Sequence, residues 1–317
     1  MKVTLSMCTD SIPVRWRLSA LACALLASTA PLAAQESAGS VFSLSGLYDE
    51  DGTYSVSAGL DHAFGEATWL RLTAGFADGA TGPVSLSTYR AGLGFDHWFA
   101  PAGVAVDVEY WGDSDTIETL AYKGELYFRG ARARFGLNAA FRDIAIKYEV
   151  PVLARNLVDA SQSFSATGYG ASYRYSWGAA SLYANAMAWN YDEAIGTVVT
   201  NVDLSRVPVL LRPAVQQRLA SAVNAVRFQS ASSLTLASSL LAQSASAGFD
   251  YRFGEKSLNI EFAHDRGEVD DLDINTLSAG WLFPAGSAAD IEIRLGVSDA
   301  DTFGTTVFGG ISVFLYR

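Results

Sequence analysis

Charged side chains recur at every second position in several stretches of this chain, where they alternate with apolar side chains. Asp107 and Glu109 alternate with Val106 and Val108, for example. Acidic and basic groups that face one enclosed space can hold ions and orient polar solutes, or they can pair with one another. The candidates for such a space are Arg71, Arg90, Asp107, Glu109, Lys123, Glu125, Arg132, Arg134, Arg142, Arg174, Arg252, Glu261, Glu292 and Arg294.

These charges allow two interpretations. In the first, they line a water-filled pore whose opposing basic and acidic walls set a transverse field and a preference among solutes. In the second, they form a network of paired charges that fills and stabilises an interior and conducts nothing. The elements that position the charges decide how wide that interior is.

The histidines are the residues to examine for catalysis. His62, His97 and His264 all fall on the apolar register near strand ends, which favours amphipathic side chains at a membrane interface. His264 is the candidate for a lipid-modifying enzyme or protease, but its neighbour Asp265 points to the opposite face and no serine motif accompanies it. We therefore predict no enzyme. The spacing of Cys and His also predicts no metal site and no cofactor.

The alternation that places these residues has a period of two, which is typical of β-strands. We expect fourteen strands, an even number, as bacterial single-chain barrels have. They lie near 41–49, 52–63, 67–77, 84–97, 103–112, 117–128, 131–149, 163–176, 180–191, 244–253, 256–265, 274–283, 288–297 and 305–316.

Two further patterns separate a membrane barrel from a soluble one. Tight turns such as 254–255 alternate with longer acidic loops such as 112–116 and 266–273. Each strand that enters the short-turn end also finishes on an aromatic residue, which suits a membrane–water interface. These aromatic residues are Phe64, Trp98 with Phe99, Phe128, Trp177, Phe253, Phe283 and Tyr316.

The first 34 residues read as a secretory signal peptide that is removed on export. A basic leader precedes an apolar run over 18–32, and small residues lie before Gln35. Cys8 and Cys23 both lie in this segment, so the mature chain has no thiol chemistry. The chain carries a net charge of −11, which makes nucleic acid an improbable partner.

With these features the chain resembles bacterial outer-membrane β-barrel proteins of the porin-like kind, over its whole mature part 35–317. Its last strand, 310–316, resembles the C-terminal insertion signal read by the barrel assembly machinery, although it ends in Arg317 and carries Phe308 where a polar residue is usual. The resemblance implies an all-β fold, a closed antiparallel transmembrane barrel of about 14 strands (12–16). It also implies an outer-membrane location, contact with membrane lipid and lipopolysaccharide, and possible homo-oligomers. Divalent cations bridging the acidic loops to lipopolysaccharide would be a modest form of metal binding.

One long insertion, 192–243, interrupts the strand rhythm between strands nine and ten. From 204 to 243 it has no acidic residue, and Pro213 could start a helix with an apolar face. The insertion could constrict or plug the lumen, lie against outer-leaflet phosphates, or decorate the surface. Its basic residues are Arg206, Arg212, Arg218 and Arg227.

Taken together, these observations favour passive diffusion of small hydrophilic solutes through a porin-like channel. About eight strands leave an interior that side chains just fill, and 16–18 leave an aqueous channel, so fourteen strands favour open space. A plugged structural or surface-interaction barrel is the alternative, and a barrel enzyme is the third possibility.

Overall fold

The computed structural model describes residues 39–81, 84–113, 117–153, 156–192, 240–268, 273–301 and 304–317. The predicted signal peptide and the arginines of the insertion, Arg206, Arg212, Arg218 and Arg227, lie outside these residues. No helix in the described part of the chain is long and apolar enough to cross a membrane.

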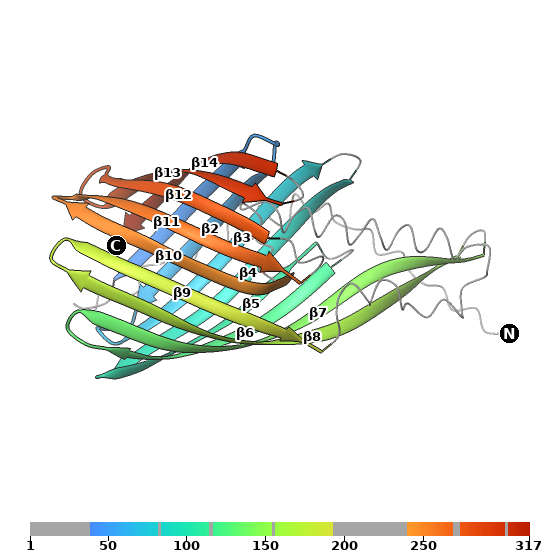
Figure 1. The fold of residues 1–317 in the computed structure, drawn as a ribbon, viewed down its shortest axis with the longest axis horizontal. Helices are drawn as coiled ribbons and strands as arrows, with labels where there is room; N and C mark the ends of the chain where they lie inside the picture. The colour runs from blue at the N-terminus through green and yellow to red at the C-terminus, as the bar shows by residue number, and fades with distance from the viewer. Residues whose placement is uncertain are drawn as a thin grey trace. The chain divides into compact units, whose positions relative to one another are not determined.

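The described residues form strands joined by turns and loops (Figure 1). Their bounds are β1 Ser40–Asp49, β2 Tyr54–Ala63, β3 Thr68–Thr81, β4 Val84–Phe99, β5 Ala102–Gly112, β6 Ile117–Arg129, β7 Ala133–Leu153, β8 Asn156–Trp177, β9 Ala180–Tyr191, β10 Leu241–Phe253, β11 Lys256–Gly267, β12 Asp273–Pro284, β13 Ala289–Ala300 and β14 Gly304–Tyr316.

The sheet closes on itself. Each strand pairs antiparallel with its neighbours in the chain, and β1 pairs with β14, where Val41 lies opposite Tyr316. A closed sheet has no unpaired edge, so within the barrel wall each strand satisfies its backbone hydrogen bonds on both sides. The predicted closed antiparallel barrel of about 14 strands is confirmed.

The two ends of the barrel differ in their connections. At the end that holds the C-terminus in Figure 1, the β8–β9 and β10–β11 turns contain Gly178 (φ 58°) and Gly254 (φ 66°). These backbone angles lie in the left-handed region that glycine adopts without steric cost. We call this the short-turn end and the opposite one the loop end.

Strands β7 and β8 are longer than the sequence indicated. They contain 21 and 22 residues and stay paired as far as Leu153 and Asn156, so that the hairpin extends past its neighbours at the loop end (Figure 1). We expected strands to 149 and from 163. Beyond its neighbours a two-stranded ribbon has free edges and tolerates Pro151, which lacks a backbone donor. In this part of the hairpin the backbone pairing does not depend on alternating apolar and polar side chains. The extension of β7 and β8 therefore could not be predicted from the sequence pattern.

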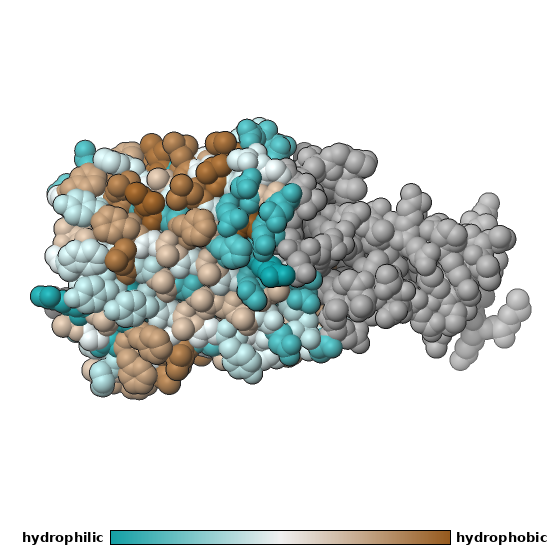
Figure 2. All heavy atoms as spheres, in the orientation of Figure 1, coloured by the Kyte–Doolittle hydropathy of each residue, from teal (hydrophilic) through white to brown (hydrophobic). Residues whose placement is uncertain are grey.

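The pairing register assigns the faces of the wall. Asp61 lies opposite Arg71, and Asp107 lies opposite Lys123, so these charges share the inner face. The outer face carries exposed apolar side chains such as Leu93, Val106 and Leu295, which are 51%, 47% and 63% exposed. Figure 2 shows brown and pale side chains covering much of the outer wall. Apolar side chains exposed in this number are what a lipid-facing surface requires.

The aromatic ring at the short-turn end is less complete than we expected. Phe99, Phe128 and Trp177 are exposed on the outer face, as predicted. Trp98 instead lies opposite Gly103, and Tyr316 opposite Val41, on the inner register. The physical reason is the alternation along a strand: Trp98 directly precedes Phe99, and a shift of one residue turns a strand side chain to the other face.

Candidate functional site in the barrel lumen

The structure places the charged candidates on the inner side of the wall. Arg132 belongs to the β6–β7 turn rather than to a strand. The others lie on strands, in the register that faces the lumen: Arg71, Arg90, Asp107, Glu109, Lys123, Glu125, Arg134, Arg142, Arg174, Arg252, Glu261, Glu292 and Arg294.

Neighbouring strands pair most of these charges with one another. Arg71 Nε donates to Asp61 Oδ1 at 2.8 Å between β3 and β2. Arg90 donates to Glu109 at 2.5 Å between β4 and β5, and Lys123 Nζ lies 3.9 Å from the same carboxylate. On β13, Arg294 pairs with Glu292 at 2.8 Å.

A second network joins β6, β7 and β8. Arg134 donates to Glu125 Oε2 at 2.6 Å, and the Ser172 hydroxyl donates to Oε1 of the same carboxylate at 2.6 Å. The Arg134 guanidinium also lies 4.1 Å from the centre of the Tyr127 ring. Gly136, between these residues, leaves the space that the carboxylate and the hydroxyl fill, because a side chain there would collide with both.

A third network lies on β8, β9, β10 and β11. Arg174 pairs with Asp250 at 3.2 Å, and the Asn259 amide donates to Asp250 at 2.8 Å. The same amide donates to the Tyr183 hydroxyl at 3.0 Å, and that hydroxyl donates to Glu261. Tyr183 extends across Gly248, which has no side chain to obstruct it.

These contacts bear on the two arrangements that the sequence left open, basic and acidic walls that face each other across the pore or a network of paired charges. The structure pairs most charges with partners on the same or nearby strands, because the register brings opposite charges within reach along the wall. Half-exposed pairs of this kind contribute little to stability, but they leave the wall strongly polar.

Arg142 differs from the other arginines of the lumen. It is 3% exposed, and its guanidinium lies 3.3 Å from the centre of the Trp189 ring. It also donates to the Tyr191 hydroxyl at 3.4 Å. The residues that the structure describes offer it no ion pair. Its inward direction followed from the sequence pattern, but its burial did not.

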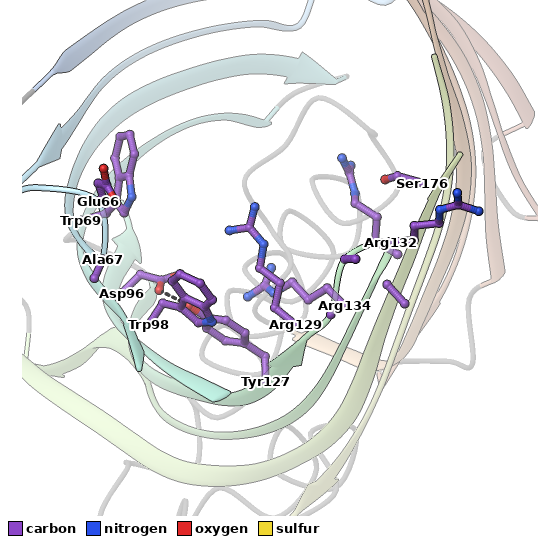
Figure 3. A pocket seen from close by; sticks show the side chains of 14 residues that line it. Glu66, Ala67, Trp69, Asp96, Trp98, Tyr127, Arg129, Arg132, Arg134 and Ser176 are labelled. Carbon is purple, nitrogen blue, oxygen red and sulfur yellow. Dashed lines mark hydrogen bonds between the residues drawn. The ribbon is translucent and has the colours of Figure 1, made fainter. Parts of the chain in front are cut away.

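Polar cavities lie along the inner wall. One, of about 380 Å³, is lined by residues of the β3–β4 and β6–β8 segments at the short-turn end (Figure 3). Another, of about 520 Å³, lies between Arg134, Arg174, Tyr183 and Glu261. A third, of about 200 Å³, is lined by Arg71, Arg90, Asp107 and Lys123 among others. Charged groups from several strands thus border open space in the lumen.

No family model and no curated protein matches this sequence. Solved structures that resemble the chain include a loop-deletion mutant of OmpT, an outer-membrane protein of Vibrio cholerae, with a TM-score of 0.48 and 11% identity over 88% of this chain and 98% of that one. OccAB1 of Acinetobacter baumannii gives a TM-score of 0.43 and 8% identity over 89% and 96%. The KdgM porin, solved with disordered oligogalacturonate, gives 0.40 and 6% over 87% and 98%.

The decisive observation is the wall itself, a closed antiparallel sheet that is apolar outside and charged inside. The fold is that of an outer-membrane β-barrel. This kind of barrel crosses a membrane with strands.

The barrel brings together functional candidates that the sequence analysis missed. Trp69 and Trp98 face the lumen at the short-turn end, together with Tyr127 and Arg129. Continuing the alternation from Lys123 and Glu125 through Tyr127 to Arg129 would have revealed the last two. The tryptophans were harder to place, because an aromatic residue near a strand end suits either face.

The histidines of the barrel lie on its outer face. His62 and His97 each share a hydrogen bond of 2.8 Å with a hydroxyl, those of Ser40 and Thr68. His264 contacts the Asn275 side chain at 3.0 Å, and its Nε2 lies 3.9 Å from Asp273. The absence of an enzyme stays a prediction.

Acidic residues of the loops close the turns of the barrel. Asp49 accepts the backbone N–H of Thr53, and Asp113 that of Ile117, both at 2.8 Å. In the described ranges no group of three His, Cys, Asp or Glu residues is arranged to hold a metal ion. The two hydrogen bonds give Asp49 and Asp113 a structural role in the loops.

Proposed function

We propose that the protein is a porin-like channel of the outer membrane through which small hydrophilic solutes diffuse passively. The observation that carries the proposal is the row of polar cavities along the lumen, bordered by Arg71, Arg90, Arg134 and Arg174 and their carboxylate partners. A wall of this kind solvates ions and polar solutes and offers no apolar path. The apolar outer face supports lipid, including lipopolysaccharide, as its surroundings.

The test is single-channel conductance of the refolded mature protein in a planar bilayer. We expect stepwise currents from the intact chain. A second sample carries a short Gly/Ser linker in place of residues 204–238, which leaves Leu240 and its hydrogen bond from Glu268 in place. Correct folding of both samples is checked by their heat-dependent migration in gels.

A plugged structural or surface-interaction barrel is the second candidate, and one observation favours it. At the loop end, inward-facing Trp111, Ile117 and Ile144 are at most 1% exposed, which is unusual for the wall of an open channel. Currents from the deletion sample alone would establish this candidate. Silence from both folded samples would contradict transport altogether.

A further inference from the structure

The cavity of about 380 Å³ at the short-turn end has two chemically different sides. Figure 3 shows Arg129, Arg132 and Arg134 extending into it from the β6–β7 region. Trp69, Asp96 and Trp98, from β3 and β4, lie on the other side. Its volume is in the range of cavities that hold small molecules, about 300–1,000 Å³.

The lining of this cavity holds four arginines, Arg129, Arg132, Arg134 and Arg174, and two acidic residues, Glu66 and Asp96. Arg134 and Arg174 are compensated by Glu125 and Asp250. Asp96 accepts a hydrogen bond of 2.6 Å from the Tyr127 hydroxyl.

Arg129 and Arg132 differ from the other two arginines, since neither forms an ion pair with any residue that the structure describes. Arg129 lies 5.8 Å from the centre of the Trp98 ring. Both guanidinium groups therefore keep donors for an incoming anion.

Tyr127, next to the two tryptophans, is held firmly in place. Tyr127 is fixed at its hydroxyl by Asp96, and its ring lies beneath the Arg134 guanidinium. Gly103 leaves the space that the Tyr127 ring occupies. Trp69 and Trp98 add flat apolar surface at low cost in side-chain entropy, which favours stacking or edge contact with a planar ring.

We propose that this cavity is a binding site for a small carboxylate that carries a planar ring. Arg129 and Arg132 hold the carboxylate through charge-assisted hydrogen bonds, for which the planar guanidinium is well suited. The ring lies along Trp98 and Trp69. This inference rests on the proposed function, since the site would retain such solutes on their way through the channel, but the binding itself does not need conduction.

Isothermal titration calorimetry on the refolded mature protein in detergent micelles tests the site. The probes are benzoate, its neutral analogue benzamide, and acetate, which lacks the ring. Benzoate should bind saturably, and both other probes at least tenfold more weakly. Losing a hydrogen bond to a charged group corresponds to roughly a tenfold or greater change in affinity.

Variants assign the binding to this cavity. Arg129→Gln and Arg132→Gln should each weaken benzoate binding about tenfold or more. Arg252→Gln is the matched control. Arg252 is also an exposed arginine of the inner register near the short-turn end, has no ion pair among the described residues, and does not line the cavity. Its removal should leave benzoate binding within twofold. Trp98→Leu should weaken benzoate and leave acetate unchanged.

The outcomes separate the site from the channel. Absence of benzoate binding to the folded wild-type protein overturns the site, whether or not the barrel conducts. An equal loss in Arg252→Gln also overturns it, because the general field of the lumen would then explain the affinity. Binding without conductance supports the site and contradicts the channel alone.

Discussion

The two halves of the lumen wall differ in what their inward-facing side chains are. Toward the short-turn end they include Trp69, Arg129 and Arg132, which border a cavity and are partly or fully exposed. Toward the loop end they include Trp111 and Ile117, which are 1% and 0% exposed. One strand ladder thus carries a hollow half and a buried half, and the buried half also holds polar side chains such as Thr88 and Thr119.

The difference shows that register alone does not define a pore. The same alternation places Arg129 and Ile117, both on β6, on one face of one strand. The cavity of about 380 Å³ belongs to the hollow half, whereas the buried half contributes packing. Trp189, for example, packs with Ala140 and Ala166 and supports Arg142.

The largest expected effect is a difference in stability between two tryptophan variants, one in each half of the lumen wall. Trp111→Ala should lower the free energy of unfolding by about 3–5 kcal/mol, because it removes a buried indole and leaves a cavity. Trp69 is 41% exposed, and Trp69→Ala should cost under about 1 kcal/mol. Urea unfolding in lipid vesicles measures both, and equal losses would abolish the distinction between the halves.

A substitution on the outer face tests the assignment of inner and outer faces on which the comparison of the two halves depends. Val106→Arg should destabilise the barrel by about 2–4 kcal/mol if the side chain meets the middle of the bilayer. The control Val106→Leu keeps the surface apolar and should change little. Unchanged stability in the arginine variant would mean that the inside and outside assignments are reversed.

Tyr183 lies within the polar network on β8–β11, and its hydroxyl joins two neighbours. Tyr183→Phe removes the hydrogen bonds to Glu261 and from Asn259, and should cost about 1–2 kcal/mol of unfolding free energy. Tyr173→Phe, on the outer face, is the matched control, for which we expect no change. A neutral result for Tyr183→Phe would show that water replaces the hydroxyl.

The smallest effect concerns ions in the hollow half. A unit charge about 8 Å from a permeating ion in water contributes about 0.5 kcal/mol. The double variant Arg129→Gln, Arg132→Gln removes two such charges, about 1 kcal/mol in all, and should therefore lower the permeability of anions relative to cations about fivefold. Reversal potentials in a salt gradient measure this ratio. Lys256→Gln, at the same end but on the outer register, should leave it unchanged.

Much of the barrel follows from the sequence, because a period of two dictates both strand and face. The inward direction of Arg71 or Glu261 required only the alternation along one strand. The ion-pair partners of these charges could not be predicted from the alternation. Arg174 meets Asp250 across the intervening β9, and such a contact depends on how three strands are staggered.

The short-turn cavity shows a different limit. Trp98 follows His97 and precedes Phe99, and an aromatic run at a strand end supplies one side chain to each face in turn. Their aromatic character favoured a position at the membrane interface for each residue of this run. Only the pairing of Trp98 with Gly103 reveals that its ring belongs to the lumen.

The pairing of β1 with β14 has a consequence for where the chain can begin and end. Ser40 and Arg317 exchange backbone hydrogen bonds of 2.8 and 2.9 Å, so the first and last described strands are ordinary neighbours in the ladder. The strands therefore form a closed ring that is interrupted only by the chain ends between β14 and β1. A circular permutation that joins Arg317 to Gly39 and places the new chain ends in the β10–β11 turn would move this interruption, while every strand keeps both of its partners.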